Sequence, residues 1–271
     1  MFYSKKLVNV VHLSGIIGSK GRRILSLSNI KPLLDKAFKP KDAKAVALII
    51  NSPGGAAAQS EIIANYIKEQ AKETKIPVIA FVEDVAASGG YFIASAATEI
   101  YALAKTSIVG SIGVLYSGFG FQELIKNYGI ERRVYSAGKN KVTLDSFQKE
   151  KAEDVAIINS LLQETHEHFK NFVKESRGNK LELADEELFS GKFWLASTGV
   201  KIGLIDGIVP SYQSFLKEKF GKKVKINFIK AKKSFLGSFL NAKIDLSENL
   251  IDDVISQFKE NITVSTLEYK K

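Results

Sequence analysis

Ser88 stands within the stretch FVEDVAASGGY, directly after an apolar run and directly before Gly89 and Gly90. A serine on a tight strand-to-helix turn is how several unrelated hydrolases expose a nucleophile. The two glycines permit backbone angles closed to other residues, and they leave space for a substrate to reach the serine. An ordinary glycine-rich turn has the same composition, so this stretch alone leaves both interpretations open.

A second glycine turn, Asn51–Gly55, follows the apolar run Ala43–Ile50. Backbone amides at the carboxyl end of a parallel strand point into the crevice where such folds bind ligands. Together with the amide of Gly89, the amides of this turn could stabilise a developing oxyanion. A plain strand-to-helix turn needs the same glycines. Two such turns, one strand apart, indicate a site more strongly than either turn does alone.

A nucleophilic serine needs a base, because a free hydroxyl is almost never ionised near neutral pH. No histidine stands between Ser88 and Lys141, and the chain has only His12, His166 and His168. The last two fall in a predicted long helix, where we expect a surface or packing role. A Ser-His-Asp arrangement is therefore disfavoured.

Lysine can replace histidine when burial, without a carboxylate partner, makes its ammonium form less favourable. Lowering a lysine pKa from about 10.4 to about 7–8 requires roughly 3–5 kcal/mol. Lys141 follows Ala137-Gly138 and has no acidic neighbour in the sequence. Lys139 is its chief competitor for the role of base.

Strand-like apolar runs and helical patterns alternate along the chain, and these elements must position the serine and the lysine. We expect strands at Lys6–Ile17, Ala43–Ile50 and Ile76–Val82, with helices between them. Such alternation favours an α/β fold with a mostly parallel sheet and helical crossovers. A further strand is expected over Glu131–Ser136, and the longest helix over Glu150–Lys174.

The composition is that of a globular protein: 271 residues, 45% hydrophobic and 25% charged, without cysteine. The absence of cysteine excludes disulfides and thiolate metal sites. The formal net charge is +10, and eight lysines lie between Lys217 and Lys233. We interpret this as a solvated basic face or as peripheral contact with an anionic membrane, because no nucleic-acid-binding signature accompanies the lysines.

The composition changes after Pro210, so we expect a domain over residues 1–210 and a basic, partly helical extension over 211–271. Within the extension, residues 235–240 and 246–258 are amphipathic. No apolar run in this chain is long enough for a transmembrane helix, and no cleavage site follows the first apolar segment. We therefore expect a cytoplasmic or peripherally membrane-associated protein.

Four motifs in order, INSPGG, AASGGYFIASAA, IVGSIGV and SAGKNK, resemble those of the S49 family of serine peptidases, which includes signal peptide peptidase A and SohB. The similarity covers roughly residues 8–210, and the later stretches are closest to the SohB branch. The resemblance implies a ClpP/crotonase-like fold and a Ser-Lys dyad, with no metal or cofactor.

Carried over by the resemblance, the nucleophile falls on Ser88 and the general base on Lys141, which closes the AGxxK element. The serine that holds the lysine in place falls on Ser111. The oxyanion amides match Gly55 and Gly89.

Two features depart from the family pattern. Asn140 stands where SohB-type sequences usually have an aromatic residue, and the usual amino-terminal membrane anchor is missing from this sequence. Relatives with a single such domain form rings in which the serine and the lysine meet across neighbouring subunits. The resemblance therefore implies a homo-oligomer, and ring contacts or core packing are alternative roles for the long helix.

The sequence thus predicts a serine endopeptidase that cleaves extended apolar peptides, such as signal peptide remnants or unstructured segments, through an acyl-enzyme. Two alternatives stay open at this point. One is a crotonase-like enzyme that binds an acyl-CoA thioester through backbone amides. The other is a catalytically idle membrane-adaptor or assembly protein whose basic tail does the binding.

Overall fold

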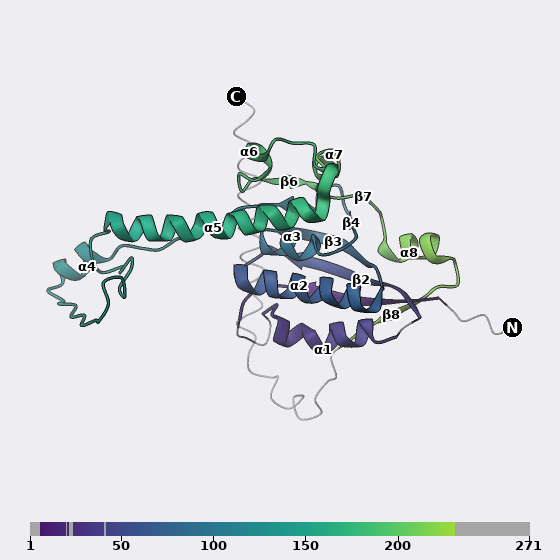
Figure 1. Ribbon diagram of the computed structural model, residues 1–271, viewed down its shortest axis with the longest axis horizontal. Coiled ribbons are helices and arrows are strands. Elements are labelled where there is room, and N and C mark those ends of the chain that lie inside the picture. Colours follow the sequence, from purple (N-terminus) through teal and green to yellow (C-terminus); the bar gives the residue numbers. More distant parts are fainter. Residues whose placement is uncertain (1–5, 20, 22–23, 41, 231–271) are drawn as a thin grey trace.

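The computed structural model describes residues 6–19, 21, 24–40 and 42–230 of the chain (Figure 1). These residues form one sheet of eight strands. The strands are β1 (Leu7–Ser14), β2 (Ala43–Ser52), β3 (Val78–Ala87), β4 (Glu99–Ala102), β5 (Ile108–Gly110), β6 (Phe193–Leu195), β7 (Gly207–Ile208) and β8 (Lys225–Phe228). The central strands are continuous apolar runs, as expected where helices cover both faces of a parallel sheet.

β3 holds the central place in the sheet. β2 pairs with one edge of β3, while β4 and β5 pair with the first and second halves of its other edge. The order is β6-β5-β3-β2-β1-β8, with β7 joined through β4. These ladders are parallel, except that β6 runs antiparallel to β5. The mostly parallel α/β sheet with helical crossovers expected from the sequence is confirmed.

Helices cover the two faces of the sheet unequally. The helices are α1 (Leu27–Phe38), α2 (Ala57–Thr74), α3 (Gly89–Ala94), α4 (Gln122–Asn127), α5 (Ala152–Arg177), α6 (Asp185–Leu188), α7 (Ala196–Lys201) and α8 (Tyr212–Phe220). One face forms the larger core with α1, α2, α3 and the end of α5. The other face packs against α8, mainly through Tyr212 and Leu216.

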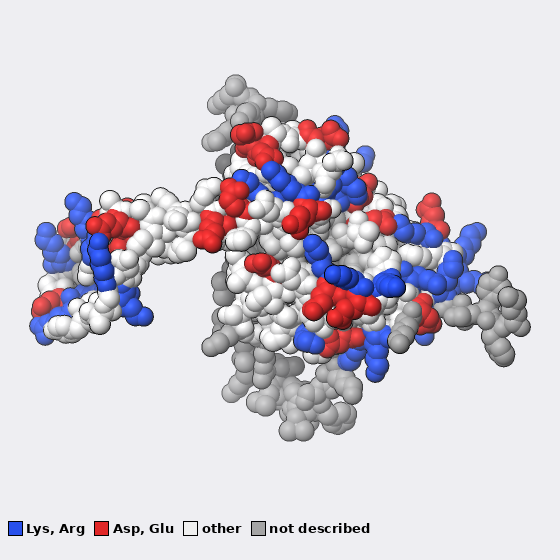
Figure 2. All heavy atoms as spheres, in the orientation of Figure 1, with Lys and Arg blue, Asp and Glu red and all other residues white. Residues whose placement is uncertain are grey.

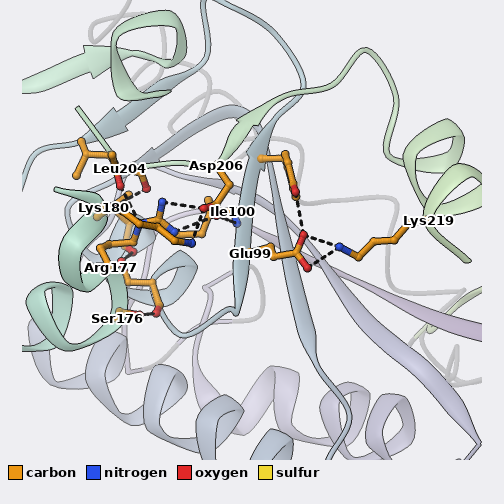
Figure 3. Close-up of polar contacts among 12 residues, drawn as sticks. Glu99, Ile100, Ser176, Arg177, Lys180, Leu204, Asp206 and Lys219 are labelled. Carbon is orange, nitrogen blue, oxygen red and sulfur yellow. Dashed lines mark hydrogen bonds and ion pairs between the residues drawn. The ribbon is translucent and has the colours of Figure 1, made fainter. Parts of the chain in front are cut away.

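The carboxyl end of α5 is fixed to the body by a buried charged network (Figure 3). Arg177 is 3% exposed and donates to both carboxylate oxygens of Asp206, at 3.0 and 3.2 Å, and to the carbonyl of Gly203 at 2.9 Å. Lys180 and the Ile100 N–H donate to the same carboxylate, at 2.6 and 2.7 Å. Burial acts to raise the pKa of Asp206, but these hydrogen bonds outweigh it and hold the pKa below its ordinary value of 3.8.

The segment from residue 114 to residue 165, which we call the arm, projects away from the body (Figure 1). It comprises the chain around α4 and the first half of α5. No residue between 113 and 168 is buried. The strand predicted over Glu131–Ser136 is wrong, because this stretch lies in the arm without regular structure and all of its residues are exposed. Large apolar side chains are exposed on the arm, including Leu115, Phe119, Tyr128, Ile130 and Tyr135.

α8 and β8 follow the division expected near residue 211, yet they pack on the sheet that the earlier elements form. β8 pairs with β1, so residues 225–228 complete one edge of the sheet. The division itself stays a prediction, because the amphipathic stretches at 235–240 and 246–258 lie outside the described residues. Among the helices that the structure describes, none has the length and apolarity to cross a bilayer.

Candidate active site

Ser88 lies at the carboxyl end of β3, on the residue that begins α3. Its backbone has φ 50° and ψ −122°, a conformation that side-chain-bearing residues rarely adopt. The Ser88 N–H donates to the Gly110 carbonyl at 2.8 Å, and the Ser88 carbonyl accepts from the Phe92 N–H at 2.9 Å. This sharp strand-to-helix turn leaves the serine only half-buried, while Gly89 and Gly90 behind it are buried. Strained backbone of this kind is characteristic of exposed nucleophiles.

The turn after β2 packs directly against the serine turn. A Cβ atom on Gly54 would lie 2.8 Å from both Ser88 Cβ and the Gly89 nitrogen. A Cβ atom on Gly90 would lie 2.4 Å from the Ser52 carbonyl oxygen. Glycine is therefore needed at both places because the two turns approach more closely than any side chain allows.

The amides of Gly55 and Gly89 are free to bind an anion. Ile17 forms a parallel bridge with Gly55, in which its N–H donates to the Gly54 carbonyl at 2.8 Å and its carbonyl accepts from the Ala56 N–H at 2.9 Å. This pattern leaves the Gly55 N–H outside the bridge. Gly89 is the first residue of α3, whose N–H has no partner within the helix. Neither N–H donates to a described residue.

Ser111 directly follows β5, the strand that pairs with the second half of β3, and so lies beside Ser88. Ala87 is paired with Gly110 in the β3–β5 ladder, so the residue after each is at the same edge of the sheet. Ser111 also has a positive φ, 54°, and its N–H donates to the Lys192 carbonyl at 2.8 Å. The structure thus brings together four of the five predicted site residues.

Lys141 is the predicted site residue that the fold does not place beside the serine. It lies in the arm, is exposed, and its side chain makes no hydrogen bond or ion pair with a described residue. Lys139, in contrast, forms an ion pair with Glu153 of the same chain at 3.4 Å. A base must lose its proton readily, so a lysine free of carboxylates is the better candidate.

None of the three histidines is hydrogen-bonded to Ser88. His12 is stacked against Phe228, and His168 is exposed. His166 Nε2 lies 3.2 Å from the Ile112 carbonyl oxygen, next to Ser111. A carbonyl only accepts, so the Nε2–H must donate. This brace between α5 and the Ser111 turn was not predicted, because the contact joins residues 54 positions apart.

Among the residues that the structure describes, no group of three acidic or histidine side chains lies close enough together to hold a metal ion. The groups that the described residues place together at the site are the hydroxyls of Ser88 and Ser111 and the free backbone amides of Gly55 and Gly89.

Two similar proteins are much longer than this chain and are named as antiporters. The sodium/proton antiporters NhaA of Brucella abortus and Brucella melitensis are each 50% identical to this chain over 233 residues. The aligned part is 85% of this chain and 31% of each antiporter. The chain thus spans about a third of the length of these relatives, and their name describes proteins that extend well beyond the shared part.

Other similarities are to peptidases. A protein of Enterococcus faecium named as a signal peptide peptidase, SppA, is 31% identical over 273 residues, covering 95% of this chain and 78% of that protein. A solved structure of the 1510-N membrane-bound stomatin-specific protease, in complex with a substrate peptide, matches with a TM-score of 0.50. It covers 88% of this chain and 97% of its own, at 19% identity, and so supports the ClpP-like fold.

The sequence model of peptidase family S49 matches residues 70–225 of this chain. The matched part is more than half of the chain and contains Ser88 and Lys141. The match agrees with the resemblance of the four motifs and favours a peptidase over an acyl-CoA-binding enzyme or an idle adaptor. This chain belongs to peptidase family S49.

Proposed function

We propose that the protein is an endopeptidase in which Ser88 is the nucleophile and Lys141 is the general base. The uncharged Lys141 amine takes the hydroxyl proton as Ser88 Oγ attacks the carbonyl carbon of a peptide bond. The peptide C–N bond then breaks, and Lys141 returns the proton to the leaving amine. A water molecule, deprotonated by Lys141, attacks the acyl-enzyme ester and releases the second product.

The negative charge that develops on the carbonyl oxygen needs donors fixed in advance. The N–H groups of Gly55 and Gly89 serve this purpose, because both are free and both belong to turns that pack against Ser88. Removing one such donor typically costs a factor of roughly 100–1,000 in rate. The observation that carries the proposal is this combination of a serine at φ 50° with two unpaired amides beside it.

Lys141 reaches a serine through assembly with a second copy of the chain. The arm that carries it has no buried residue and points away from the body (Figure 1). Tyr135 is 91% exposed and Phe119 is 78% exposed. Apolar side chains displayed in this way mark a protein interaction surface. A homo-oligomeric ring, in which each arm lies against the neighbouring body, would bury them and join Lys141 to the neighbour's Ser88.

The substrates are peptides. We propose extended, apolar segments, such as signal peptide remnants or unstructured regions, because the amides and the serine lie together at the carboxyl ends of neighbouring strands, where parallel sheets bind their ligands. The cytoplasmic or peripherally membrane-associated location and the contact with an anionic membrane stay predictions at this stage.

Covalent labelling by a fluorophosphonate probe tests the proposal. The assembled wild-type protein should be labelled at Ser88 in its folded state, and Ser88→Ala should abolish labelling. Lys141→Ala should lower the labelling rate at least about 100-fold, because general-base catalysis contributes roughly 100–10,000-fold. Lys139→Ala is the matched control and should label at the wild-type rate.

Labelling of another serine, or wild-type rates in the Lys141→Ala variant, would show that the nucleophile or the base has been assigned wrongly. Native mass determination of each variant shows whether the assembly is intact, so loss of activity through disassembly is recognised.

A further inference from the structure

A set of exposed lysines gathers at the edge of the sheet where the parallel strands begin. They come from five separate places in the sequence: before β1, between α1 and β2, within β2, before β3, and from the α8–β8 turn into β8. Figure 2 shows Lys and Arg side chains concentrated at the end of the molecule where α8 and β8 lie. We call this surface the basic edge, and its residues are Lys6, Lys39, Lys44, Lys75, Lys222, Lys223 and Lys225.

Parallel strands explain why these lysines meet. The amino ends of parallel strands lie at one edge of a sheet, and Leu7 is paired with both Ala43 and Lys225. Lysines that are remote in sequence thus become neighbours. The carboxyl ends, with Ser88, lie at the opposite edge.

The positive charge of the basic edge is not neutralised by the fold. All seven lysines are exposed, and none forms an ion pair with a described acidic side chain. The exposed acids within four residues of these lysines are Asp35, Asp42, Glu73 and Glu218, of which Asp35 is already paired with Lys31 at 2.9 Å. Glu99, at the start of β4, is already paired with Lys219 at 2.6 Å. Seven lysines against four nearby acids, one of them already paired elsewhere, leave a net positive surface that favours an anionic partner.

The chemistry of the basic edge fits a lipid surface better than a nucleic acid. Its cations are all lysines, and the exposed aromatic side chain of β8, Phe228, lies at the other end of that strand, opposite Val10. Base-specific recognition of duplex nucleic acid relies largely on arginine forks, and binding of single strands relies on aromatic stacking. Anionic headgroups present diffuse charge, to which each lysine near the surface contributes separately, without fixed geometry.

We propose that the basic edge docks on an anionic phospholipid bilayer. The strands then stand away from the membrane, with the serine turn at their far end. β2 contains ten residues, which at roughly 3.3 Å per residue span about 33 Å. A polypeptide that leaves the bilayer therefore needs about ten extended residues to reach the site. This orientation does not depend on the proposed peptidase chemistry.

Vesicle co-sedimentation of the full chain tests the proposal, with phosphatidylcholine vesicles and with vesicles that also contain phosphatidylserine. The test variant carries Lys222→Glu, Lys223→Glu and Lys225→Glu. Each lysine near an anionic surface adds roughly fivefold to partitioning, so loss of three should weaken binding on the order of 100-fold. Binding should also fall steeply as salt is raised from 50 to 300 mM.

The control variant reverses three exposed, unpaired lysines outside the edge, Lys105, Lys149 and Lys201. It has the same net charge as the test variant and should keep most of the wild-type binding. Equal binding by the two variants would overturn the proposal, as would absence of wild-type binding at 50 mM salt or equal binding to phosphatidylcholine alone. Preference for duplex DNA in a competition assay would reassign the surface to nucleic acid.

Discussion

Mixing two inactive variants tests whether the arm supplies its lysine to a neighbouring chain. The Ser88→Ala variant keeps the proposed base, Lys141, but has no nucleophile. The Lys141→Ala variant keeps the nucleophile, Ser88, but has no base. If the dyad forms only within one chain, no mixture can be active. If it forms across subunits, a Lys141→Ala subunit regains activity whenever its neighbour is a Ser88→Ala subunit. The exposed, unpaired Lys141 on a projecting arm favours the second outcome.

The recovered activity has a definite size. In rings assembled at random from equal amounts, half of the sites have the serine, and half of those face an arm with the lysine. About a quarter of the wild-type sites should therefore be active. The assay is the initial rate of cleavage of a fluorogenic peptide after co-expression, compared with the same total concentration of wild-type protein.

The matched control is the Lys141→Ala variant mixed with the double variant Ser88→Ala/Lys141→Ala, which contains no lysine at position 141 and should stay inactive. Mass analysis must show mixed rings in both samples. Activity below about a twentieth of the wild-type rate in verified mixed rings would refute delivery of the lysine between subunits.

Three further predictions concern the body of the protein. Gly54→Ala should cut probe labelling at least about 10-fold, because its Cβ would lie 2.8 Å from Ser88 Cβ, whereas Gly221→Ala, with a similar φ of 103° but open space, should label normally. Labelling of both variants at one rate would contradict this. Arg177→Met should lower the free energy of unfolding in urea by about 3–5 kcal/mol, since it leaves the Asp206 carboxylate without its buried partner; a loss below about 1 kcal/mol would show that the pair contributes little. The pKa of Asp206 is lower in the folded state than its ordinary 3.8, so its stabilisation is complete above about pH 4 and is lost as the pH falls through the folded pKa. Asp206→Asn, although less stable at pH 7, should lose less stability over that acid range, and parallel curves for the two proteins would argue against the assignment.

The features that could be predicted from the sequence are those set by short stretches. A continuous apolar run followed by NSPGG or ASGG fixes a buried strand and its turn, so Gly55, Ser88 and Gly89 fall at one edge of the sheet once neighbouring strands pair. Ser111 could be named only through the resemblance of IVGSIGV to the family, because β5 has only three residues and gives no strand pattern of its own.

Other features depend on contacts with residues that are distant in the sequence or belong to another chain, and a local sequence pattern does not identify these. The sequence predicts a strand over Glu131–Ser136, but a strand needs a neighbour to pair with, and the described part of this single chain offers the arm none. The change to a lysine-rich composition after Pro210 predicts a separate extension. In the structure, however, β8 of this stretch is paired with β1 of the sheet. The brace from His166 to Ile112 joins two elements that have no relation in sequence.

The uneven burial of α5 has a consequence for amide hydrogen exchange along this helix. Its buried side chains, Phe169, Val173 and Arg177, all lie in the half that rests on the body. Backbone amides of the half that projects, from Ala152 to Thr165, are held by the helix alone and should exchange with deuterium far faster. Contact with another copy would slow that exchange. The exchange rate of the projecting half of α5 therefore reports what fraction of the chains in a sample is assembled.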